Sequence, residues 1–227
     1  MVLVVASSRP WHLGMGEKLV KLTGLAWHQI GSIDELNAEF LSDIGATQIF
    51  FPHWSHIIPA AVFENFECVI FHMTDLPYGR GGSPLQNLIV RGHSNTVISA
   101  LRCERGIDTG PVFLKRPLSL AGPAHEIFDR ATAVIETMIV DIVREGIKPK
   151  IQEGLPTHFK RRKPADSDMR DVKSAREIYD HIRMVDADGY PKAYVEVGNL
   201  RIEFEDAQLE ENLVTARVSI TIRSESS

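Results

Sequence analysis

The sequence predicts an α/β fold: a Rossmann-like, mostly parallel sheet with helices on both faces, followed by a small C-terminal β-rich appendage. Three observations predict this fold. Short apolar runs with β-branched members, such as residues 68–71, are typical of strands buried on both faces. Segments of helical periodicity alternate with these runs. After residue 150 the composition becomes polar and proline-containing, and from Tyr194 the chain alternates as hairpin strands do. We therefore place a main domain at 1–150 and a linker, helix and small β subdomain at 151–227.

The individual elements follow from local signals. Strands are expected at residues 2–6, 25–30, 48–51, 68–71, 96–102 and 112–118, and helices at 14–22, 32–44, 84–91, 123–145 and 174–184. Ser32 and Glu35 have the spacing of a capping box, in which each side chain satisfies a backbone donor of the other. Ser83 and Pro84 suit the N-cap and first position of a helix. Apolar residues recur at helical spacing from Ile127 to Ile142, so the long helix is expected to cover the sheet.

Composition limits the class of partner. The chain of 227 residues is 44% hydrophobic and 24% charged, with a net charge of -5. Because neutralising phosphates needs an excess of Lys and Arg, this balance argues against nucleic acid and favours a small partner.

Cys68 and Cys103 lie in apolar segments without C-x-x-C spacing, which predicts reduced core thiols. Without a basic leader or an apolar run of membrane-spanning length, the protein is expected to be cytoplasmic and not bound to a membrane.

The most unusual chemistry lies between residues 66 and 111. His72 follows a buried strand, and open α/β sheets bind ligands beyond the carboxyl ends of their strands. A structural histidine at a strand end is the alternative. The glycine-rich turn at residues 79–82 leads into the helix that begins at Pro84, an arrangement that can hold an anion. The same glycines could serve only to reverse the chain.

Two loops offer further polar and aromatic groups. Arg9, Trp11 and His12 follow the first strand and provide a charge, a stacking surface and a donor, although a plain surface loop fits equally. The loop lacks G-x-G-x-x-G, so dinucleotide binding is not supported. His53 and His56 flank Trp54, and two His three residues apart could ligate a metal ion, but no third ligand is nearby. We therefore interpret this loop as one that lines a pocket.

Two motifs in this region resemble a known family. The pattern from His72 to Pro84, with Thr74, Leu76, Pro77, Arg80 and Gly81 between them, resembles the H-x-S-L-L-P-x-Y-R-G-x-x-P signature of folate-dependent formyltransferases. The sequence I-D-T-G-P, which closes at Pro111, is similar to that family's D-x-G-P turn. The tail segment F-K-R-R-K-P-A-D-S from Phe159 resembles the sugar-nucleotide N-formyltransferase branch. The sequence around the Gly-rich turn is similar to that of the pseudaminic-acid pathway formyltransferase and to those of the formylation domains of nonribosomal peptide synthetases.

The resemblance implies roles for residues in the site. Residues 1–150 would be the catalytic domain, with His72 as the acid–base group and Asp108 as the carboxylate that orients it. The formyl donor would be N10-formyltetrahydrofolate, with no metal. The folate-binding residues would be Trp54, Arg80, Gly81, Gly82, Pro84 and Gly110. The nucleotide-sugar-binding candidates would be Arg9, Trp11, His12 and Arg162.

The sequence departs from the family at one catalytic position. The family has Asn-x-His, and Ile70 stands where the Asn, which helps to hold the oxyanion, is expected. Loss of one such donor typically costs about 10²–10³ in rate. A backbone N–H, Thr74 or Asn95 could replace it, and Asp75 is a further candidate for oxyanion or substrate contact.

The resemblance predicts a formyl transfer to the 4-amino group of a nucleotide-linked amino sugar. The expected substrate is UDP-4-amino-4,6-dideoxy-N-acetyl-altrosamine of pseudaminic acid biosynthesis. The alternatives are formylation of a carrier-bound amino acid, formylation of methionyl-tRNA, which the acidic balance and short tail disfavour, and a catalytically inactive folate-binding module suggested by Ile70. The alternating hairpin also allows a homodimer.

Overall fold

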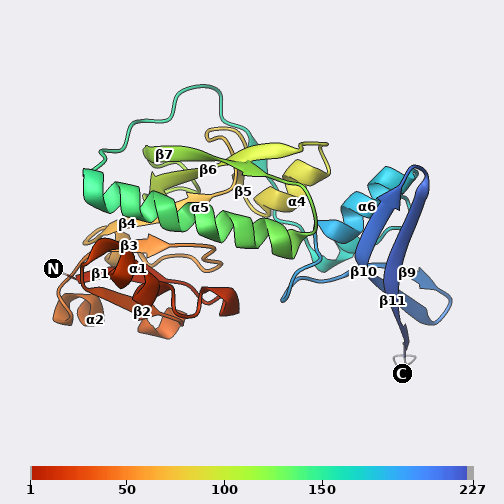
Figure 1. Ribbon diagram of the computed structural model, residues 1–227, viewed down its shortest axis with the longest axis horizontal. Helices are drawn as coiled ribbons and strands as arrows, with labels where there is room; N and C mark the ends of the chain where they lie inside the picture. Colours follow the sequence, from red (N-terminus) through yellow and green to blue (C-terminus); the bar gives the residue numbers. More distant parts are fainter. Residues whose placement is uncertain (1, 224–227) are drawn as a thin grey trace. The chain divides into compact units, whose positions relative to one another are not determined.

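A six-stranded sheet organises the first of two structural units (Figure 1). The structure, a computed structural model, describes residues 2–223. The strands are β1 (Val2–Ala6), β2 (Trp27–Ile30), β3 (Ala46–Phe51), β4 (Glu67–His72), β6 (Asn95–Arg102) and β7 (Val112–Ser119), in the order β2-β1-β3-β4-β6-β7. Strands β2, β1, β3 and β4 are parallel, whereas β6 runs antiparallel to β4. The predicted mostly parallel sheet is therefore confirmed.

Helices cover both faces of this sheet. The helices are α1 (Met15–Thr23), α2 (Ala38–Asp43), α3 (Ala60–Phe63) and the long α5 (Ala124–Glu145), with single 3-10 turns at Pro10–His12 and Ile33–Glu35. On one face, Leu41 of α2 and Val62 of α3 pack against β-strand residues such as Phe51. On the other face, α1 is joined to α5 by the Lys18–Glu136 ion pair, with 2.5 Å between Nζ and Oε2.

The helix predicted over residues 32–44 begins later than expected, so the predicted start at Ser32 is wrong. The Ser32 side chain accepts a hydrogen bond from the Asp34 N–H and caps only a 3-10 turn. The α-helix begins later, where the Asn37 side chain accepts from the Phe40 N–H. Asn is as good an N-cap as Ser, so the later cap competes successfully for the helix start.

A small antiparallel sheet forms the second unit, together with α4 (Pro84–Ile89) and α6 (Ala175–Arg183). Its strands β9 (Ala193–Val197), β10 (Leu200–Glu210) and β11 (Leu213–Ile222) lie in the order β11-β10-β9, and α6 lies beside β10 (Figure 1). The short elements β5 (Arg80–Gly81), β8 (His158–Phe159) and a 3-10 turn (Pro164–Ser167) complete the chain. The predicted β-rich appendage is confirmed as an antiparallel sheet.

The units are built from interleaved segments of chain. The first unit comprises residues up to Gly81, Thr96–Leu118 and Asp129–His158, and the second comprises Gly82–Asn95, Ser119–Phe128 and the residues from Phe159 onward. The domain boundary expected at residue 150 stays a prediction. Between residues 2 and 223, no helix has the length and apolar character needed to cross a membrane.

A buried ion pair fastens α6 within the second unit. The Arg183 guanidinium donates to Asp180 Oδ1 at 2.6 Å and to the carbonyl oxygens of Leu120 and Gly122 at 2.6 and 2.9 Å. Arg183 is only 3% exposed. Because a buried charge is tolerated when it is paired and hydrogen-bonded, these bonds account for its burial.

Gly110 provides a test of how closely the turn before β7 approaches β6. A Cβ atom on Gly110 would lie 1.9 Å from the Arg102 carbonyl oxygen, so the backbone would have to move. We expect Gly110→Ala to lower the free energy of unfolding by about 2 kcal/mol or more, as overpacking does. Gly31→Ala is the matched control, because a Cβ there meets no atom within 4 Å. Equal stability of the two variants in urea denaturation would contradict this account.

Candidate active site

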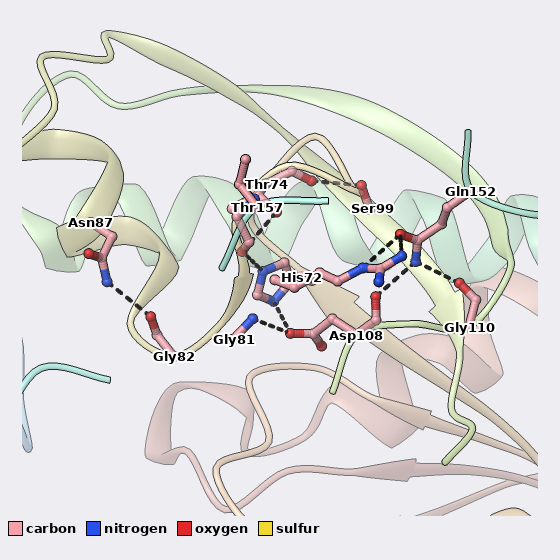
Figure 2. Close-up of polar contacts among 12 residues, drawn as sticks. His72, Thr74, Gly81, Gly82, Asn87, Ser99, Asp108, Gly110, Gln152 and Thr157 are labelled. Carbon is pink, nitrogen blue, oxygen red and sulfur yellow. Dashed lines mark hydrogen bonds and ion pairs between the residues drawn. The ribbon is translucent and has the colours of Figure 1, made fainter. Parts of the chain in front are cut away.

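His72 is the last residue of β4, so the sheet presents its imidazole at the carboxyl end of a buried strand. Its strand partner on β6 is Ser99, whose hydroxyl donates to the Thr74 carbonyl oxygen at 2.7 Å and fastens the chain just after the strand. The imidazole contacts two acceptors (Figure 2). Nε2 lies 2.8 Å from the Gly79 carbonyl oxygen, and Nδ1 lies 3.5 Å from Asp108 Oδ2.

The two acceptors restrict the protonation chemistry of the ring. The Gly79 carbonyl can only accept, so Nε2 carries a hydrogen when the 2.8 Å bond is formed. Nδ1 is then the ring nitrogen that can exchange a proton. A neutral ring can donate to only one of the two groups, whereas an imidazolium can donate to both. The side chains of His72 and Asp108 keep 9% and 12% exposure, so a substrate can approach only a narrow edge of this pair.

Asp108 reaches the imidazole from a strained turn. Its φ of +53° lies in the left-handed region, which is uncommon for residues other than Gly and is tolerated best by Asn and Asp. Its Oδ2 atom accepts a hydrogen bond from the Gly81 N–H at 2.8 Å. The carboxylate therefore joins the turn before β7 to the Gly-rich turn, and the structure brings together the two groups predicted for acid–base chemistry.

The candidates for the missing oxyanion donor have other contacts. Thr74 is fully buried, and its hydroxyl lies 3.5 Å from the Gly79 carbonyl oxygen. The exposed Asn95 donates its amide to Ser94 Oγ at 3.1 Å. Asp75 forms an ion pair with Lys115, with 2.5 Å between Oδ1 and Nζ. The apolar side chain of Ile70 supplies no donor, and the source of oxyanion stabilisation stays a prediction.

The residues predicted to bind folate have structural partners within their own units. Arg80 donates to Gln152 Oε1. A Cβ on Gly82 would lie 2.5 Å from Arg161 Cβ, and Pro84 opens α4. Trp54 packs against the Phe51 ring at a centroid distance of 5.7 Å. The close approaches at Gly82 and Gly110 explain these glycines by chain packing, and their roles in folate binding stay predictions.

Two polar residues beyond the signature were missed in the sequence. The Gln152 amide nitrogen donates to the carbonyl oxygens of Asp108 and Gly110, at 2.8 Å each. Thr157 Oγ1 accepts from the Gly79 N–H at 2.7 Å, and its carbonyl oxygen accepts from the Arg80 N–H at 2.9 Å. Both lie in an irregular segment without periodicity. Only their contacts reveal that they hold the turns around His72.

His12 forms a second cluster of titratable groups, with His53. The rings stack at a centroid distance of 5.2 Å, and His12 also bonds Ser7 Oγ at 2.7 Å and Thr132 Oγ1 at 3.0 Å. Burial, with the nearby Arg9 charge, lowers the pKa of His12 to about 4. Burial lowers the pKa of His53 to about 3, with further contributions from His12 and Arg9. Both rings are therefore neutral at pH 7.

The remaining loop candidates lie in different parts of the chain. Arg9 lies over the Trp11 ring at 5.5 Å from its centroid, so both residues belong with the histidine cluster in the first unit. Arg162 belongs to the second unit, where its N–H donates to Ser83 Oγ at 3.1 Å and its guanidinium to the Asp166 carbonyl oxygen. In the described part of the chain, no group of three or more His, Cys, Asp or Glu side chains is placed to hold a metal ion.

Comparison with known proteins relates this geometry to a family. Residues 164–221 match the family model described as methionyl-tRNA formyltransferase, C-terminal domain. A solved structure described as methionyl-tRNA formyltransferase from Clostridium thermocellum is 44% identical, covers 98% of this chain and 99% of its own, and superposes with a TM-score of 0.94. The methionyl-tRNA formyltransferase of Sorangium cellulosum is 31% identical over 64% of this chain and 50% of its own. The chain belongs to the formyltransferase family.

The expected sugar-nucleotide branch is wrong. A likely sugar N-formyltransferase from Mycobacterium tuberculosis has a TM-score of 0.69 but only 16% identity over 87% of this chain and 92% of its own, so it shares the fold alone. The relatives with much higher identity are named for methionyl-tRNA. The tail segment F-K-R-R-K-P-A-D-S from Phe159, on which that expectation was based, is too short to distinguish the branches.

The expected partners need the same correction. A nucleotide-linked amino sugar was expected and nucleic acid excluded, yet the relatives are named for a tRNA substrate. Net charge is a sum over the whole chain and does not report a local basic segment. Lys160, Arg161 and Lys163 form such an exposed segment in the second unit. The chain spans about half the length of the first curated relatives that it matches.

The histidine cluster predicts a pH dependence of stability. The unfolded imidazole binds a proton near pH 6.5, whereas folded His53 does so only near pH 3. Between these values the unfolded state holds more protons, so stability falls as pH falls, by up to about 1.4 kcal/mol per pH unit. His53→Asn, which tolerates the native φ of +49°, should reduce this slope in urea denaturation between pH 7 and 4.5.

The exposed His56 in the same loop provides the matched control. His56→Asn should leave the slope unchanged. If the free energy of unfolding of His53→Asn depends on pH as steeply as that of the wild type, the pKa of His53 is not lowered in the folded protein.

Proposed function

We propose that this chain transfers a formyl group from N10-formyltetrahydrofolate to the α-amino group of methionyl-tRNA. The observation that carries the proposal is the 44% identity, over nearly the full length of both chains, to a structure described as a methionyl-tRNA formyltransferase. The His72–Asp108 pair supports it, because formyl transfer to an amine requires a group that removes and returns a proton.

The residues present fit a folate donor. The donor supplies a formyl group already bonded to a nitrogen that can leave, so the protein needs proton transfer and charge stabilisation. The partly exposed edge of His72 and Asp108 provides these groups. Trp54 lies in the loop after β3, the strand beside β4, and its buried indole N–H lacks a hydrogen-bond acceptor among the described residues. An acceptor atom of the pterin would satisfy this donor.

His72 takes the proton from the attacking amine on Nδ1, since Nε2 is held by the Gly79 carbonyl. A bond forms between the amine nitrogen and the formyl carbon, and the bond from that carbon to the leaving nitrogen then breaks. His72 returns the proton to the leaving nitrogen. While protonated, the imidazolium donates to Asp108 and stabilises the negative charge on the formyl oxygen. This charge partly replaces the donor that Ile70 does not supply.

Methionyl-tRNA binding has support in the second unit. The exposed Lys160, Arg161 and Lys163 form a local cationic segment, and the 164–221 match to the C-terminal domain of the named enzymes begins directly after it. Phosphates bind such side chains with release of counterions, so affinity for the tRNA should fall as salt rises.

The test of this function is a formylation assay with N10-formyltetrahydrofolate and methionyl-tRNA. We expect formylmethionyl-tRNA, detected by chromatography after hydrolysis of the ester, at a rate that exceeds that with free methionine by at least tenfold. Equal formylation of free methionine would show that the tRNA is not recognised. Folate binding without formyl transfer would favour an inactive folate-binding module.

Variants of the acid–base pair test the mechanism. We expect His72→Ala to lower the turnover number at least 10²-fold, the low end for loss of general acid–base catalysis. Asp108→Asn should have an effect of similar size, because it removes the negative charge beside the imidazolium. Asn tolerates φ of +53°, so the turn should keep its conformation. Thermal denaturation near the wild-type midpoint would confirm that both variants are folded. Turnover within tenfold of wild type in either variant would contradict the assigned role.

A further inference from the structure

The Gln152 side chain lies between two groups of the active site that are far apart in the sequence (Figure 2). Its Nε2 atom donates to the carbonyl oxygens of Asp108 and Gly110, at 2.8 Å each. Its Oε1 atom accepts from Arg80 Nε at 3.2 Å and from Arg80 Nη2 at 2.7 Å. One amide therefore contacts both the turn that carries the carboxylate and the guanidinium of the Gly-rich turn.

These four bonds use the whole capacity of the amide. A Gln side chain has two N–H donors and a carbonyl oxygen with two lone pairs, and each has a partner here. A carboxylate would keep the acceptors but face the two carbonyl oxygens without a hydrogen. An aliphatic side chain would lose all four bonds. The arrangement is thus specific to an amide of this length.

The bonds act on a part of the backbone that needs external support. Asp108 adopts φ of +53°, in the left-handed region that residues with a side chain adopt only rarely. Gln152 holds the carbonyl groups on either side of Thr109, while the Gly81 N–H holds Asp108 Oδ2. Together they fix both the backbone and the carboxylate of Asp108 beside His72.

The segment around Gln152 is anchored by polar contacts. Lys150 exchanges two backbone hydrogen bonds with Val112, at 2.7 and 2.8 Å, and Thr157 binds the N–H groups of Gly79 and Arg80. Between these anchors, Ile151 and Leu155 are 85% and 91% exposed. Because little apolar surface is buried here, the contacts of Gln152 contribute to the geometry of the turns more than to the stability of the core.

We propose that Gln152 is a positioning residue that holds Asp108 against His72 and directs the Arg80 guanidinium toward the folate donor. This inference rests on the proposed function, which places Asp108 in the acid–base pair, and on the role in folate binding that the family resemblance implies for Arg80. Its two halves are separable, because the amide nitrogen acts on Asp108 and the amide oxygen acts on Arg80.

Two substitutions separate the halves. Gln152→Glu keeps acceptors for Arg80 but loses the donors to the turn, so we expect kcat to fall at least tenfold with KM for N10-formyltetrahydrofolate within threefold of wild type. Gln152→Leu loses both sets, so kcat should fall similarly and KM should rise at least fivefold. Glu153→Gln, at an exposed position of the same segment, should leave both constants unchanged.

A binding measurement provides a readout that does not depend on turnover. By titration calorimetry, N5-formyltetrahydrofolate should bind Gln152→Leu at least fivefold more weakly than wild type, and Gln152→Glu within threefold. Equal kcat and KM in all three variants would overturn the proposal. A shared loss of thermal stability, with unchanged constants for the folded fraction, would assign Gln152 a structural role and also overturn it.

The outcomes distinguish this inference from the proposed function. If the wild type binds the folate but formylates no methionyl-tRNA, the proposed acceptor fails while the calorimetric difference between Gln152→Glu and Gln152→Leu still supports the positioning of Arg80. If the wild type formylates methionyl-tRNA but the variants match it, the function stands and the role of Gln152 fails.

Discussion

The position of one carboxylate oxygen is the constraint on which the candidate site depends. Asp108 Oδ2 accepts the Gly81 N–H at 2.8 Å and lies 3.5 Å from His72 Nδ1. This atom therefore joins the end of β4, the Gly-rich turn and the turn before β7. Moving the backbone of Asp108 would disturb all three at once. The left-handed conformation of that residue and the close approach at Gly110 both serve to bring the oxygen to this position.

The sheet and the polar segment contribute differently to the site. Parallel strands with buried side chains, such as Val69, fix where His72 emerges. They do not fix what faces the ring, because the facing groups lie in irregular chain. These groups are held by hydrogen bonds that Gln152 donates to the turn of Asp108 and that Thr157 accepts from the Gly-rich turn. A rigid apolar scaffold thus carries a site whose final geometry is set by hydrogen bonding.

Much of the fold could be predicted from periodicity, and part of the site from motif spacing. His72 at a strand end and Asp108 in its turn were predicted, and the structure brings them together. Gln152 could not be predicted, because a lone amide in a segment without periodicity gives no signal. The helix start predicted at Ser32 was wrong because Asn37 is an equally good N-cap, and the α-helix begins directly after Asn37. The exclusion of nucleic acid was wrong because it was argued from the acidic net charge, which does not report the short basic segment before residue 164.

The exposure of Ile151 and Leu155 has a consequence for how the protein responds to stress. A segment held by hydrogen bonds, with its apolar side chains in water, can open locally at a small fraction of the cost of global unfolding. When it opens, Asp108 and Arg80 lose a shared support while the six-stranded sheet remains intact. We therefore expect mild heat or denaturant to disturb the hydrogen bonds around Asp108 and Arg80 before it melts the fold.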